Sequence, residues 1–179
     1  MIQNEMLQKV GVWIKPRFKK YEIILALVTV IGFALMLLKV HESYFILQIS
    51  LSILGILYFF NVYAPIEDVY MTGIENFIKY LLGWSLSIIT IGITFTILRL
   101  KGNEQMLFVG TIATICILIY SIIQISRQNE LSSYYKPIAL RSTIYIVICL
   151  FLLLTPKDEL KRIGIIRDIQ IEPHATIGR

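Results

Sequence analysis

Five apolar stretches, each free of Asp, Glu, Lys and Arg, alternate with short charged segments along the chain. The stretches are residues 23–38, 43–66, 80–98, 105–126 and 142–155. Hydrocarbon about 30 Å thick requires about 20 predominantly apolar residues of helix. The pattern therefore predicts an all-α, polytopic helical membrane protein with about five transmembrane helices. We expect the spans over residues 21–39, 43–63, 77–98, 105–126 and 137–155.

The uncharged interiors of these stretches limit the mechanism as well as the fold. Ion relays, voltage sensors and proton pumps place ionisable side chains at membrane depth, and the stretches contain none. Arg141 stands at the beginning of the fifth span, where we expect its side chain to snorkel to the interface. Residues 137–155 are then long enough to cross, with a re-entrant or interfacial helix as the alternative.

Polar segments flank the transmembrane domain, which covers residues 21–156. Residues 1–20 form a basic amphipathic segment in which Met6, Val10, Trp13, Ile14 and Phe18 follow helical spacing. This segment is either a helix on the membrane surface with Trp13 at headgroup level, bent or ended by Pro16, or a frayed terminus. In the polar tail, residues 157–179, the alternation over 165–171 indicates either a short strand or a disordered segment.

Composition and charge support insertion into a bilayer. The chain of 179 residues is 56% hydrophobic and 16% charged, whereas soluble domains carry about 25% charged residues. Five of the basic residues fall in the first twenty positions: Lys9, Lys15, Arg17, Lys19 and Lys20. This placement favours an N-terminus on the inside and contact with anionic lipid, not nucleic acid. We expect an integral protein of the bacterial inner (cytoplasmic) membrane.

Small and polar residues recur at helical spacing in the second, third and fourth spans. The third span carries Gly83, Ser87, Thr90 and Thr94 on one face, and a second face carries Ser85, Gly92 and Thr96. The neighbouring spans carry Gln48, Ser52 and Gly55 in the second, and Gly110 and Thr114 in the fourth. Because helices in lipid associate through close packing over small residues, we expect the third span to be central.

These faces have two interpretations. The first is helix–helix packing with interhelical hydrogen bonds. The second is a neutral polar cavity for a ligand or lipid headgroup, lined by Gln48, Ser52, Ser87, Thr90 and Thr114. Aromatic residues near the span ends predict an interfacial belt; these are Tyr58, Phe59, Phe60, Tyr63, Tyr70, Tyr80, Trp84, Tyr120, Tyr134 and Tyr135.

Catalytic and cofactor signals are absent from the sequence. It contains no G-x-S-x-G, H-E-x-x-H or P-loop motif. The two histidines, His41 and His174, cannot provide paired haem ligands within transmembrane helices. The two cysteines, Cys116 and Cys149, lie in apolar stretches and are interpreted as small packing residues. We therefore expect no enzymatic activity, cofactor or metal.

The first two spans also carry features of a known family. The features are Gly32 in the first helix, Lys39 and His41 near its end, and Pro65-Ile66-Glu67-Asp68 after the second helix. This region, residues 21–68, resembles the membrane hairpin of the inner-membrane motor subunit of bacterial gliding motility and type IX secretion. That family has two spans, a long cytoplasmic region and a glutamate in its second helix, which has no counterpart between Ser43 and Tyr63. The resemblance implies a role in membrane assembly without the motor chemistry.

Together these observations predict a non-catalytic integral membrane subunit that packs against or stabilises a larger membrane protein complex. Its expected partners are the lipid bilayer and other membrane protein subunits. The alternative is a transporter or substrate-binding membrane component with a neutral polar intramembrane pocket. Prolines near the edges of the spans, and not at their centres, count against the discontinuous helices typical of transporters.

Overall fold

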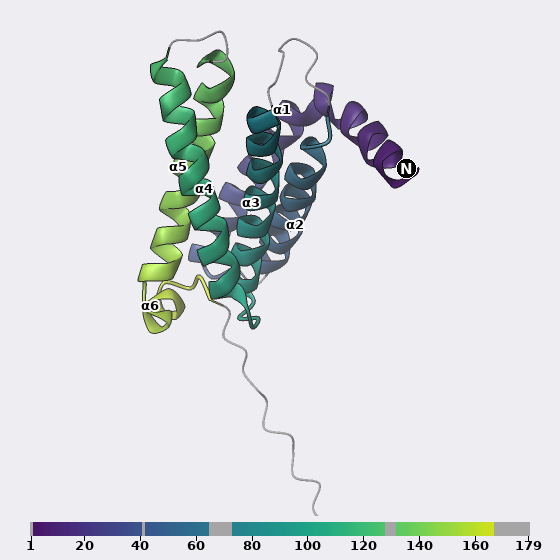
Figure 1. Cartoon of the computed structure of the whole chain (residues 1–179). Helices are drawn as coiled ribbons and strands as arrows, with labels where there is room; N and C mark the ends of the chain where they lie inside the picture. The colour runs from purple at the N-terminus through teal and green to yellow at the C-terminus, as the bar shows by residue number, and fades with distance from the viewer. Residues whose placement is uncertain (1, 41, 65–72, 128–131, 167–179) are drawn as a thin grey trace, which may run out of the picture.

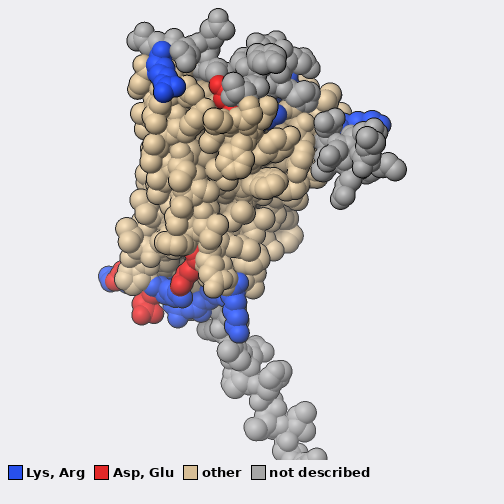
Figure 2. All heavy atoms as spheres, viewed as in Figure 1, with Lys and Arg blue, Asp and Glu red and all other residues tan. Residues whose placement is uncertain are grey.

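The computed structural model describes residues 2–40, 42–64, 73–127 and 132–166, with side chains from residue 9 onward, and within them all regular structure is helical. The helices are α1 (Ile2–Leu37), α2 (Ser43–Asn61), α3 (Gly73–Ile97), α4 (Asn103–Ser126), α5 (Ser132–Leu154) and α6 (Lys157–Arg162) (Figure 1). Five of these helices are long and apolar enough to cross a membrane. Figure 2 shows an uncharged band between charged ends on the face in view. The chain is thus an all-α integral membrane protein, as the sequence predicts.

The five long helices pack in chain order, and α3 lies at the centre. Each helix from α1 to α4 packs against the next along the chain, and α3 also contacts α5. In α3, 67% of the most apolar window is buried inside the bundle, compared with 11% in α1. This confirms that the third span is central, because its two small-residue faces admit a neighbour on each side.

The basic N-terminal segment is continuous with the first span. Helix α1 has 36 residues and passes through Pro16 without interruption, so it is about 54 Å long and exceeds the hydrocarbon thickness. Its N-terminal part turns away from the bundle (Figure 1). Ile14 and Phe18 are buried against the core, whereas Trp13 is exposed, with the Arg17 guanidinium 5.0 Å from its ring. The predicted apolar stripe is therefore divided between the bundle and the surface.

The two short turns, between α1 and α2 and between α3 and α4, share one backbone geometry. Each contains a basic residue in the left-handed region, Lys39 with φ 59° and Arg99 with φ 57°. The Leu100 N–H donates to the Phe95 carbonyl at 2.9 Å, and the equivalent bond closes the first turn. This pattern is the Schellman cap, which satisfies carbonyls at the end of a helix. Both basic side chains are exposed at the same end of the bundle.

The start of the C-terminal tail covers this end of the bundle, a contact that no pattern in the sequence predicts. After α6, Gly164 adopts φ 86°, and the chain turns back against the bundle. Leu160, Ile165 and Ile166 are each buried, and the Tyr44 hydroxyl donates to the Gly164 carbonyl at 2.9 Å. Apolar burial and one hydrogen bond therefore dock the beginning of the tail.

Some expectations fall on residues outside those described. Residues 165–171 have a short strand as one of two alternatives; Ile165 and Ile166 are not in a strand, and the remaining residues lie outside the described ranges. Four further residues named in the sequence analysis also lie outside the described ranges: His41, Glu67, Asp68 and His174. Helix α5 begins at Ser132, five residues before the expected start of the span at Pro137, which lies inside the helix.

Replacing Tyr44 with phenylalanine should loosen α6. The substitution removes the hydrogen bond to Gly164 without changing the ring, which typically costs about 1 kcal/mol. Hydrogen exchange of peptides covering residues 157–166, measured by mass spectrometry in micelles, should become faster. Tyr63→Phe, near the other end of α2, is the matched control. Equal exchange in the wild-type chain and Tyr44→Phe would contradict the docking role of this bond.

Candidate functional site

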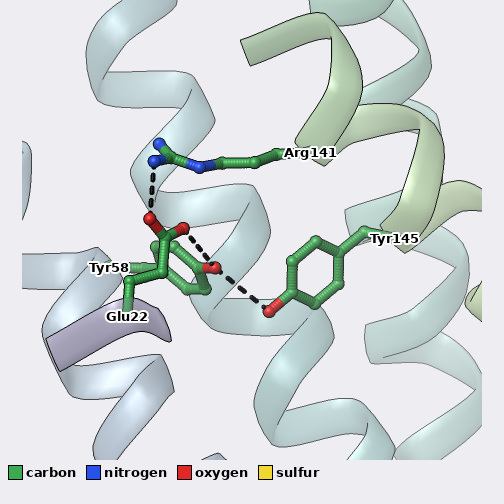
Figure 3. Close-up of polar contacts among 4 residues, drawn as sticks. All are labelled: Glu22, Tyr58, Arg141 and Tyr145. Carbon is green, nitrogen blue, oxygen red and sulfur yellow. Dashed lines mark hydrogen bonds and ion pairs between the residues drawn. The ribbon is translucent and has the colours of Figure 1, made fainter. Parts of the chain in front are cut away.

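A hydrogen-bonded network of ionisable side chains joins α1, α2 and α5 (Figure 3). The Arg141 guanidinium donates from Nη2 to Glu22 Oε2 at 2.5 Å. The Tyr58 hydroxyl donates to the other carboxylate oxygen, Oε1, at 3.0 Å. The Tyr145 hydroxyl donates in turn to the Tyr58 oxygen at 3.3 Å. We call these four residues the Glu22 network.

The Glu22 network is largely enclosed by the bundle. The side chains of Glu22 and Arg141 are 12% and 28% exposed, and both tyrosines are buried. Glu22 lies about 22 Å along the helix axis from the end of α1, and Arg141 lies about 20 Å from the end of α5. The two charges therefore lie at similar distances from the ends of α1 and α5, in the part of the bundle farther from α6.

Aromatic rings enclose the ion pair. The Arg141 guanidinium carbon lies 5.3 Å from the centroid of the Phe18 ring, a cation–π distance. The Tyr58 ring packs between Phe18, at a centroid distance of 6.1 Å, and Tyr145, at 5.9 Å. Both carboxylate oxygens of Glu22 accept a hydrogen bond. The arrangement therefore satisfies a buried carboxylate and connects α1 to α5, whereas α1 otherwise packs mainly on α2.

The Glu22 network corrects one expectation. The Arg141 side chain turns to Glu22 of α1, so the bundle interior contains a paired acid and base. Glu22 and Arg141 stand directly before Ile23 and Ser142, where two of the uncharged stretches begin. Both therefore lie just outside the stretches from which the spans are predicted. One signal in the sequence could have found them. The first and fifth spans run in the same direction, and opposite charges at similar distances from their ends lie at the same depth.

The residues of the predicted aromatic belt divide into rings that face outward and rings that are buried. Trp84 and Tyr80 are 47% and 38% exposed, so these rings face outward from the bundle. Tyr58 and Tyr135 are 5% and 0% exposed and belong to the core. Their hydroxyls made an interfacial position plausible from sequence, but packing between helices decides which rings face inward.

Glycines on the predicted small-residue faces permit close helix contact. A Cβ atom built on Gly83 of α3 would lie 1.7 Å from Val62 Cγ2, after α2. On Gly110 of α4, it would lie 2.5 Å from Ile89 Cγ1 of α3. Gly55 of α2 also faces α3, but there the nearest atom would be 3.6 Å away. These three positions therefore bring α2, α3 and α4 together.

The hydroxyl groups on these faces bond mainly to their own helices. Thr90, Thr94 and Thr114 are buried, and each donates to the carbonyl four residues earlier at 2.5, 3.1 and 2.8 Å, respectively. Ser87 is also buried. Such bonds satisfy a hydroxyl within a packed interface. These positions accordingly form packing surfaces on α3 and α4.

Gln48 and Ser52 do not join the other residues predicted to line a polar pocket. Both are exposed on α2, whereas Leu47 and Leu51 take the buried positions beside them. The spacing of Gln48, Ser52 and Gly55 is helical, but the leucines bury more apolar surface and set the rotation of α2. The second interpretation, a neutral polar cavity, requires Gln48 and Ser52 to face Ser87, Thr90 and Thr114, and the structure does not bring them together.

The described residues contain no group of three or more His, Cys, Asp or Glu side chains that could hold a metal ion. Cys149 is buried in the core, while Cys116 is exposed. The fold and the Glu22 network thus define a polytopic helical membrane protein with a buried ion pair. No family model, curated protein or solved structure matches the chain.

Proposed function

We propose that this chain is a non-catalytic membrane subunit that binds a transmembrane helix of a larger partner through the outward face of α2. The observation that carries the proposal is the exposed amide of Gln48 on an otherwise apolar surface. Phe45, Ile49 and Ile53 surround it in sequence and are 66%, 44% and 46% exposed. We call Phe45, Gln48, Ile49, Ser52 and Ile53 the α2 outer face.

An amide in this position favours a polar partner. Gln48 lies about 7.5 Å from the start of α2 at Ser43, inside the span. No described residue forms a hydrogen bond with its side-chain amide. Ser52 lies one turn further along the same face. Lipid chains cannot satisfy such groups, whereas a neighbouring transmembrane helix with a polar side chain can. The α2 outer face therefore combines apolar contact area with hydrogen-bonding groups.

The remaining candidate surfaces have partners within the chain. The small residues of α3 and α4 pack the bundle, and the charges of Glu22 and Arg141 neutralise each other. With both oxygens of the Glu22 carboxylate occupied, the network has the character of a structural tie between helices. These observations support a role in binding a protein partner and not in catalysis.

Site-specific photo-cross-linking in cell membranes tests the proposal. A benzophenone amino acid at Ile49 or Ile53 should give an adduct with another membrane protein, identified by mass spectrometry. The same probe at Ile144 or Val147, on the exposed face of α5, is the control and should give little adduct. An adduct of two 20.7 kDa chains would show a second copy on this face and overturn the binding of a larger partner.

Gln48→Leu should weaken this contact without unfolding the chain. One interhelical hydrogen bond in a membrane protein contributes about 0.6 kcal/mol on average, which corresponds to about threefold in affinity. The adduct yield from a probe at Ile53 should therefore fall about threefold or more. Thr143→Val, which removes an exposed hydroxyl from α5, should leave the yield unchanged. An unchanged yield in Gln48→Leu would contradict a role for the amide.

The Glu22 network favours a second candidate function, a transporter component, because ionisable groups at membrane depth are typical of ion and substrate pathways. The double variant Glu22→Gln/Arg141→Gln separates the two functions in cells that lack the native chain. If the chain is a subunit, the double variant should still restore the function that these cells lack and should still give the cross-link from Ile53. A transporter should lose complementation while the protein level and the cross-link persist.

A further inference from the structure

A cavity lies at the end of the bundle that α6 covers, where the α3–α4 turn meets the end of α5. Its volume is about 570 Å³, within the range of about 300–1,000 Å³ typical of small-molecule sites. It lies at the level of the charged side chains that Figure 2 shows at the lower end of the molecule. This position corresponds to a membrane–water boundary.

The polar side of the cavity is cationic. Arg99, Lys101 and Lys157 line it together with a single acidic residue, Glu104. Lys157 is paired with Glu104 at 2.6 Å, whereas Arg99 and Lys101 have no ion-pair partner among the described residues. Among the described residues, the cavity therefore has two positive charges that no carboxylate pairs.

The other side of the cavity is apolar and continues onto the membrane-facing surface. Leu107, Leu152 and Leu160 form its buried wall. Leu100 and Leu154 also line it and are 44% and 78% exposed, so they extend the wall outward. A ligand that fits both sides has an anionic head and a hydrocarbon tail.

We propose that this cavity binds the phosphate headgroup of an anionic glycerophospholipid. The headgroup lies between Arg99 and Lys101, and an acyl chain follows the leucine wall into the bilayer. The docked start of the tail forms part of the site, since Ile166 and Leu160 belong to its lining. This proposal is independent of the α2 outer face, which lies on a different helix.

Thermal unfolding in dodecyl maltoside, with defined lipids added, tests the site. Dioleoyl phosphatidylglycerol should raise the unfolding temperature saturably, and dioleoyl phosphatidylcholine should have a much smaller effect. Arg99→Gln/Lys101→Gln should weaken the apparent affinity for phosphatidylglycerol about 30-fold, on the basis of the usual contribution of each basic residue near anionic lipid. Both side chains are exposed, so the variant should fold.

Lys39→Gln is the matched control, because Lys39 occupies the same left-handed position in the other turn and does not line the cavity. It should retain the affinity of the wild-type chain. Equal phosphatidylglycerol affinity in the double variant would overturn the site. Equal stabilisation by phosphatidylcholine would overturn its preference for an anionic headgroup. Equal stabilisation by inorganic phosphate at the same concentration would overturn the contribution of the acyl chain.

Discussion

Arg141→Gln is expected to lower the free energy of unfolding by about 3 kcal/mol or more, because it leaves Glu22 buried without its cation. Removing one partner of a buried ion pair typically costs about 3–5 kcal/mol. Phe18 and Tyr58 exclude water from the remaining carboxylate, which must then be protonated or solvated by rearrangement. Reversible unfolding in mixed detergent micelles, followed by circular dichroism, measures the change.

The double variant Glu22→Gln/Arg141→Gln distinguishes loss of the pair from loss of either residue. The double variant should lower the free energy of unfolding by less than the sum of the two single variants. Each single variant leaves one buried charge without its partner, whereas the double variant leaves none. Arg162→Gln is the control, since its ion pair with Glu159 is 3.8 Å long and exposed. Such a change should stay within about 0.5 kcal/mol of wild type. Additive effects of the single variants would contradict the ion pair.

Gly83→Ala should be the most damaging small substitution in the bundle. The new methyl group would lie 1.7 Å from Val62 Cγ2 and 2.8 Å from the Tyr58 carbonyl oxygen. The end of α2 must then move away from α3, and overpacking of this kind costs about 1–3 kcal/mol. The displacement would also disturb Tyr58 and, through it, the Glu22 network. Unfolding in micelles and the yield of folded protein measure the effect.

Gly55→Ala is the matched control on the facing helix, where the nearest atom to the added methyl group would be 3.6 Å away. That distance is an ordinary van der Waals contact, so the stability should change little. Gly83→Ala/Val62→Ala should recover part of the loss, because it removes the closer of the two obstructing atoms. The same stability in Gly83→Ala and Gly55→Ala would contradict the close approach of α2 and α3.

The candidate site shows where prediction from the sequence stopped. Glu22 and Arg141 are separated by more than one hundred residues, and each borders an uncharged stretch. Their pairing depends on α1 and α5 meeting beside α2, which no local pattern encodes. The outward position of Gln48 could not be predicted for a different reason, which is the rotation of α2. Its spacing with Ser52 and Gly55 fits a helix face, but helical spacing alone cannot state which face turns inward.

The apolar stretches by themselves determined the membrane class, the number of long helices and the central position of α3. They did so because span length and small-residue spacing are local properties with direct physical consequences in lipid. Only the tertiary structure decided that the interior contains a paired acid and base, that Gln48 faces outward and that the tail covers a cationic cavity. Each depends on the rotation and depth of one helix relative to others, which side-chain packing sets when the whole bundle forms.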